Sequence, residues 1–165
     1  GKSPLKARSH ISMVAEIVTT SFKSSRWSRH PMVNNALLDE GYAKALSVMR
    51  ANATKVGFSA STERHVNYYS IWARDHSMCS LAAVLTQDKE LIDTSIKGIL
   101  HLLRGQSGSG QVPSYIEIES RKRMFGGLGT ITSLDSNMWV LVAAAELYKT
   151  TKDKRLISVA NMQRY

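Results

Sequence analysis

The segment DHSMCSLAAVLTQDKELIDTSIKGILHLLR, residues 75–104, predicts two successive helices of different character. The first, with its interior from Met78 to Leu85, is apolar on nearly every side, which is typical of a helix surrounded by protein. Asp88 follows and is predicted to cap the second helix. The apolar residues of this second helix recur at helical spacing and predict one buried stripe, made of Leu91, Ile92, Ile96, Ile99, Leu100 and Leu103.

The same order returns about 60 residues further along the chain. Asp135 or Ser136 is predicted to cap a second nearly all-apolar helix, from Met138 to Tyr148. A short turn then leads into an amphipathic stretch over residues 156–162. We interpret the pattern as a repeat of helical hairpins with long loops gathered at one end, and the alternative is a plain helical bundle with two incidental long loops.

The rest of the chain is predicted to be largely helical as well. Residues 5–22 have apolar positions on one helical face, and Asn34 is a plausible cap for a helix that runs to about Asn52. Residues 55–69 read as a long connection, and residues 112–118 as a short extended piece. We therefore predict an all-α fold with a single domain over residues 1–165, in which residues 1–32 form a basic N-terminal segment and residues 33–165 form the hairpins.

The net charge of +9 makes a basic, nucleic-acid-binding helical protein one alternative. The charge is concentrated in the first thirty residues and in Arg121, Lys122 and Arg123. Neither cluster has the interleaved aromatic residues of a single-strand platform or a recognisable DNA-binding motif. A solvated basic surface is the favoured interpretation, and nucleic acid is not the expected partner.

Cysteine content and hydropathy place further bounds. Cys79 is the single cysteine, so an internal disulfide is excluded, and its apolar surroundings predict a buried, inert thiol. No apolar run approaches the roughly 20 residues needed to span a bilayer. With no secretory apolar segment visible at the start of the sequence, a cytoplasmic location without a membrane partner is expected.

Two junctions between polar segments and apolar helices carry the functional signal. They are SIWARDHS, residues 70–77, and SLDSNMW, residues 133–139, and each places an Asp within a few positions of a Trp. A sugar ring offers a C–H face for stacking and hydroxyl groups that need charged partners. These junctions therefore predict a carbohydrate site, in which Trp72 stacks on the sugar while Asp75 accepts hydrogen bonds and Arg74 orients it.

Each carboxylate also has a purely structural interpretation, because an Asp before an apolar run is an ordinary helix cap. As a functional group, Asp135 could act as a general acid. Enclosure beside Trp139 would favour the protonated carboxyl that an acid needs, whereas a helix N-terminus favours the ionised form. Glu117 and Glu119 are weak candidates for a second carboxylate, because their alternation with apolar residues fits a strand edge equally well. The five histidines form no metal-ligand spacing, so neither a metal nor a cofactor is expected.

Four motifs, WARDHS, GQVPS, LDSNMW and LYKTTKD, occur in an order that resembles the six-hairpin glycoside hydrolases. Within that class they most resemble glycogen-debranching (amylo-α-1,6-glucosidase) domains and their glucoamylase- and neutral-invertase-like relatives, over residues 69–153. The resemblance implies an (α/α)₆ toroid, sugar binding by Arg74 and Asp75, and Asp135 as general acid or as a further sugar ligand. It also implies cleavage of α-glucosidic bonds with inversion and without a cofactor.

Six hairpins need well over twice this length, so the resemblance predicts a partial barrel that corresponds to an N-terminal fragment and lacks the second catalytic carboxylate. We expect an oligosaccharide or glucoside substrate, bound by Trp72, Arg74, Asp75 and Trp139, with Asp135 as the catalytic residue. Helix faces left exposed in such a fragment predict self-association. The missing carboxylate keeps a second hypothesis open, in which the chain is a non-catalytic carbohydrate-binding or regulatory domain.

Overall fold

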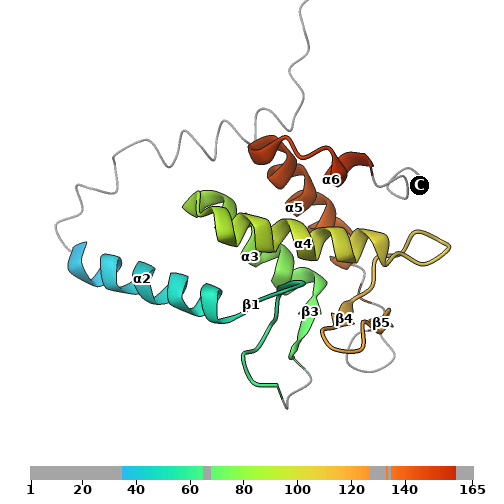
Figure 1. Ribbon diagram of the computed structural model, residues 1–165, viewed down its shortest axis with the longest axis horizontal. Coiled ribbons are helices and arrows are strands. Elements are labelled where there is room, and N and C mark those ends of the chain that lie inside the picture. The colour runs from blue at the N-terminus through green and yellow to red at the C-terminus, as the bar shows by residue number, and fades with distance from the viewer. Residues whose placement is uncertain (1–34, 65–67, 127–132, 134, 159–165) are drawn as a thin grey trace, which may run out of the picture. The chain divides into compact units, whose positions relative to one another are not determined.

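A computed structural model describes residues 35–64, 68–126, 133 and 135–158 (Figure 1). The described part is mostly helical and also contains two small antiparallel sheets. The helices are α2 (Asn35–Ala51), α3 (Ala73–Thr86), α4 (Lys89–Arg104), α5 (Asp135–Thr151) and α6 (Arg155–Ser158). The strands are β1 (Ala53–Thr54), β2 (Gly57–Phe58), β3 (Ser70–Trp72), β4 (Tyr115–Glu117) and β5 (Arg123–Met124). The boundary between two compact units falls within α2, between Ala43 and Lys44, and the site and the core lie in the second unit.

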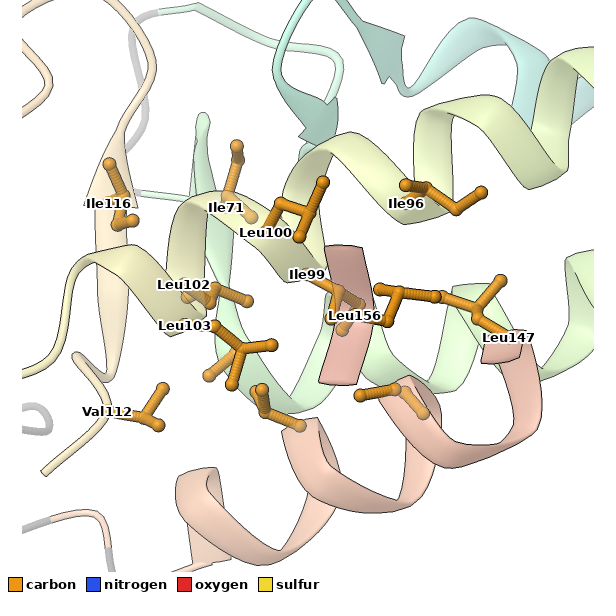
Figure 2. Close-up of a cluster of buried hydrophobic side chains, with 14 of the residues drawn as sticks. Ile71, Ile96, Ile99, Leu100, Leu102, Leu103, Val112, Ile116, Leu147 and Leu156 are labelled. Carbon is orange, nitrogen blue, oxygen red and sulfur yellow. The ribbon is translucent and has the colours of Figure 1, made fainter. Parts of the chain in front are cut away.

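The core forms where α3, α4 and α5 pack together (Figure 2). Helix α4 contributes most of its apolar stripe, and Ile99, Leu102 and Leu103 are completely enclosed. Leu147 of α5 and Leu156 of α6 close the cluster at one end, while Ile71 and Ile116 join it from the sheet. The predicted stripe of α4 is confirmed except at Ile92, which is half-buried.

The helices pair in two hairpins, α3–α4 and α5–α6. Within each hairpin the two helices are joined by a turn, and the two turns are equivalent. The sequences TQDKELI, residues 86–92, and TKDKRLI, residues 151–157, share a Thr whose hydroxyl accepts the backbone N–H of the following Asp, at 3.0 and 3.2 Å. Between them, Gln87 and Lys152 both have a φ of 58°, the left-handed conformation that reverses the chain. Each Asp then accepts the N–H two residues later, as a helix N-cap does, so the predicted cap at Asp88 is confirmed.

The prediction that α3 and α5 are surrounded by protein is wrong. Each helix buries one face, and the buried face of α3 consists of the small or compact side chains Ala73, His76, Ser77, Ser80 and Ala83. On the opposite face Leu85 and Met138 are each 70% exposed. A helix with apolar residues on every side can be buried on every side only if other elements pack against all of them. The described elements pack against one side of α3 and one side of α5.

The all-α prediction is also incomplete. Part of the segment expected to be a connection folds as the β1–β2 hairpin, in which residues 56–59 are buried rather than exposed. The predicted extended piece contains β4, which lies between β3 and β5 in a three-stranded sheet. Strands of two or three residues are too short to produce a visible alternation of apolar and polar positions. The described residues are mostly helical, as predicted, but they do not show a toroid.

No helix in the described part of the chain is both long and apolar enough to cross a membrane. The predicted helix over residues 5–22, the proposed cap at Asn34 and most of the stretch 156–162 lie outside the described residues.

Candidate functional site

The two Trp–Asp junctions meet in the folded chain. Arg74, the second residue of α3, donates a hydrogen bond from Nη1 to Oδ2 of Asp135, the first residue of α5, over 2.8 Å. The two helices therefore begin at the same end of the core and pack against each other along their length. Because the side chains of Arg74 and Asp135 are 64% and 37% exposed, the ion pair lies at the surface, where a ligand can reach it.

Asp75 does not cap α3, so the structural interpretation of this residue is wrong. The cap position is Trp72, whose extended backbone continues from β3 and whose side chain makes no capping hydrogen bond. The first backbone N–H of the helix, that of Ala73, donates instead to the carbonyl of Ser114 beside β4 at 2.8 Å. Asp75 lies within the first turn, exposed, and its carboxylate has no hydrogen-bond or ion-pair partner among the described residues.

Asp135 is held from two sides. While Oδ2 accepts from Arg74, Oδ1 accepts from the hydroxyl of Ser133 at 2.9 Å. The Ser133 hydroxyl also contacts that of Ser136, at 2.8 Å. With both oxygens engaged as hydrogen-bond acceptors, the carboxylate has a fixed orientation at the start of α5, where the helix dipole favours negative charge.

An aromatic cluster lies at the end of β3 beside this ion pair. Trp72 stacks on Tyr115 with ring centroids 4.4 Å apart and an interplanar angle of 25°, and Tyr68 contacts Trp72 at 5.4 Å. Trp72 is half-buried, and its indole N–H has no hydrogen-bond partner among the described residues. Tyr68 is 45% exposed, so much of the accessible ring surface of the cluster belongs to Tyr68.

Sequence reasoning missed both tyrosines. Tyr115 faces Trp72 because β3 and β4 are antiparallel with Trp72 opposite Tyr115 in the register. The two residues are far apart in sequence, and no local pattern indicates their pairing. Tyr68 had a local signal, since it precedes Trp72 by four positions in a polar segment.

Two of the motifs that carry the resemblance, GQVPS and LDSNMW, are in direct contact. The side-chain oxygen of Asn137, in LDSNMW, accepts the backbone N–H of Val112, in GQVPS, at 2.9 Å. Gln111 in turn donates from its amide to the carbonyl of Phe125 at 3.3 Å. The bond from Val112 to Asn137 holds the loop before β4 against the first turn of α5.

The remaining candidates lie apart from the cluster or have structural roles. Trp139 is half-buried on α5, one turn after Asp135, and within the described residues its ring does not stack on the Trp72 cluster. Glu117 of β4 accepts a hydrogen bond from Ser120, and Glu119 is exposed in the following turn. No cluster of His, Cys, Asp and Glu suited to a metal ion occurs in the described part of the chain.

Two titratable side chains in α3 belong to the interior. His76 is enclosed and makes structural hydrogen bonds: its Nδ1 accepts from the backbone N–H of Phe58 at 3.0 Å, and its Nε2 lies 3.1 Å from the carbonyl of Ser95. Burial lowers the pKa of His76 to about 4. Cys79 is half-buried, and burial raises the pKa of its thiol, which makes it a poor nucleophile.

Comparison with protein-family models, curated proteins and solved structures finds no match for this chain.

Proposed function

We propose that the chain binds α-linked glucose oligosaccharides at the end of the core where α3 and α5 begin, as the sugar-binding part of a glycoside hydrolase site. The observation that carries this proposal is the 2.8 Å ion pair between Arg74 and Asp135, which joins two junctions 60 residues apart beside a cluster of three aromatic rings. A carbohydrate site needs these two kinds of surface together, one for the C–H face of the ring and one for its hydroxyl groups.

Each group has a distinct task in this proposal. The exposed ring of Tyr68, supported by Trp72 and Tyr115 behind it, provides the stacking surface. Asp75 provides a carboxylate whose hydrogen-bonding capacity is unused within the described residues. Arg74 donates hydrogen bonds to hydroxyl oxygens from the nitrogens that do not contact Asp135, since a guanidinium carries five N–H donors.

Asp135 is a sugar ligand in the resting arrangement. Its Oδ2 accepts from Arg74 and its Oδ1 accepts from Ser133, so both oxygens already serve as acceptors, whereas a general acid must donate a proton to the substrate. The acid role that the resemblance implies would require the substrate to separate Arg74 from Asp135. The ion pair therefore favours our second candidate, a non-catalytic carbohydrate-binding domain, for the chain in isolation.

Asp75→Asn is expected to weaken binding of maltooligosaccharides about tenfold or more, because it converts charge-assisted hydrogen bonds to neutral ones. Isothermal titration calorimetry measures this loss. Asp93→Asn is the matched control, since Asp93 is an equally exposed carboxylate on α4, away from the start of α3. A wild-type chain that binds no maltooligosaccharide would overturn the proposal.

Asp135→Asn separates the two candidate roles. If Asp135 is a sugar ligand, the substitution lowers affinity about tenfold or more. If it is the general acid of a larger enzyme, affinity is retained while hydrolysis by that enzyme falls by about two to four orders of magnitude. Calorimetry together with an assay of released glucose distinguishes these outcomes.

A further inference from the structure

Helices α3 and α5 share an apolar surface that the described residues leave uncovered. We name this surface the α3/α5 face. Its large apolar side chains are between 38% and 70% exposed, and they are Met78, Leu85, Met138, Leu141 and Val142. On each helix these residues recur at helical spacing on the side opposite the buried stripe. Helix α4 packs against both buried stripes, so the α3/α5 face points away from α4.

The side chains of this face are those of an interface rather than of a solvated surface. Large apolar residues exposed singly are ordinary, but several together on two adjacent helices form a patch of the kind that marks an association site. Met78 and Met138 add flexible side chains that adapt to an opposing surface. Smaller neighbours, Ala82 and Ala145, lie between the large residues and allow a partner helix to approach closely.

The charges at the two ends of the face are complementary. At the end where both helices begin lie Asp75 and Asp135 with Arg74, which leaves a net negative charge. At the other end, in the last turn of α5 and just after it, lie Lys149 and Lys152 with Glu146, which leaves a net positive charge. The helix dipoles have the opposite polarity and offset part of these charges, so the complementarity that favours an antiparallel partner comes from the charged side chains alone.

We propose that the α3/α5 face is the interface of an antiparallel, two-fold symmetric dimer formed by a second copy of this chain. In a two-fold dimer the same patch meets itself, and the antiparallel orientation brings the acidic end of each copy against the basic end of the other. The acidic end of this interface contains Arg74, Asp75 and Asp135, so dimer formation and the proposed sugar binding compete for the same residues. The proposal specifies the surface for the self-association that the sequence predicts.

The size of the face implies a weak dimer. Helices of 14 and 17 residues are about 21 and 25 Å long, and two of them side by side present a strip about 20 Å wide. This corresponds to roughly 400–500 Å² on each copy, at the lower limit of specific interfaces. Dimerisation is therefore expected to be reversible and to depend on protein concentration.

Sedimentation equilibrium on the full chain, over a wide range of concentrations, tests the dimer. The wild type is expected to show a reversible monomer–dimer equilibrium, and Leu141→Glu to raise its dissociation constant about tenfold or more. Ile157→Glu is the matched control, because Ile157 is exposed to 47%, close to the 45% of Leu141, but lies on α6 outside the face. A wild type that stays monomeric, one that forms open-ended aggregates, or a dimer equally sensitive to both substitutions would overturn the proposal.

A charge exchange tests the antiparallel orientation. Lys149→Glu places like charges opposite each other and is expected to weaken the dimer, and adding Asp75→Lys is expected to restore part of the lost affinity. Circular dichroism checks that each variant retains its fold. Failure of the double variant to recover any affinity, with the fold intact, would contradict the proposed orientation.

Discussion

Gly98→Ala is expected to destabilise the chain by about 3 kcal/mol, the upper end of the usual cost of overpacking, because the new methyl group has no space. A Cβ at position 98 would lie 2.2 Å from Nε2 and 2.3 Å from Cε1 of His76, and the ring cannot turn away. The imidazole ring of His76 is completely buried, and its two nitrogens contact the backbone N–H of Phe58 and the carbonyl of Ser95. The backbone of Gly57 approaches from the β1–β2 hairpin, since a Cβ there would lie 2.8 Å from Cα of Gly98. Chemical denaturation followed by circular dichroism measures the loss.

Gly41→Ala is the control for this prediction. Gly41 also lies inside a helix, α2, but it is exposed, and a Cβ there would meet no atom of the described residues within 4 Å. The higher helix propensity of alanine should therefore leave the chain unchanged or stabilise it by up to about 1 kcal/mol. Equal destabilisation by the two substitutions would refute the close packing of Gly98 against His76.

Acidification is expected to remove about 3 kcal/mol of the free energy of unfolding through His76 alone. Burial lowers the pKa of this imidazole from 6.5 to about 4 in the folded chain, while the unfolded chain keeps the ordinary value. The unfolded state therefore binds a proton that the folded state does not, so the contribution is complete above about pH 6.5 and is lost as the pH falls toward 4. Denaturation curves recorded at several pH values across this window measure the slope.

The control for the pH dependence is His101→Gln. His101 is half-buried, and burial followed by the nearby Arg121 and Arg104 lowers its pKa as well, so it adds to the slope with the same sign. The His101→Gln variant should keep most of the pH dependence. A nuclear magnetic resonance titration of the wild type provides a second test that needs no His76 variant. An imidazole of His76 that becomes protonated near pH 6.5 while the chain remains folded would contradict this account.

The parts of the fold that follow local rules were predictable. Asp88 caps α4 because its carboxylate reaches the N–H groups of Glu90 and Leu91, an interaction that needs only neighbouring residues. The apolar stripe of α4 and the repeat of hairpins follow from helical spacing in the same way. The fold class was only partly predictable, because β1 and β2 are stabilised by distant groups. Phe58 is held by His76, which lies 18 positions away.

The candidate site shows the same division. Sequence order alone indicated that Arg74, Asp75 and Asp135 lie at the beginnings of apolar helices. That Asp75 does not cap α3 could not be read from the sequence, because the helix begins earlier, at Ala73, whose N–H donates to the carbonyl of Ser114 across the sheet. Likewise, only the strand register places Tyr115 against Trp72.

The sequence by itself determined the helices, the cap at Asp88 and the order of the two hairpins, because these depend on side chains within about four residues of one another. The tertiary structure decided which faces of α3 and α5 are buried, where the β1–β2 hairpin packs, and that Arg74 meets Asp135. Those outcomes depend on contacts between residues distant in the chain, and a helix that is apolar on every side does not specify which side its partners will cover.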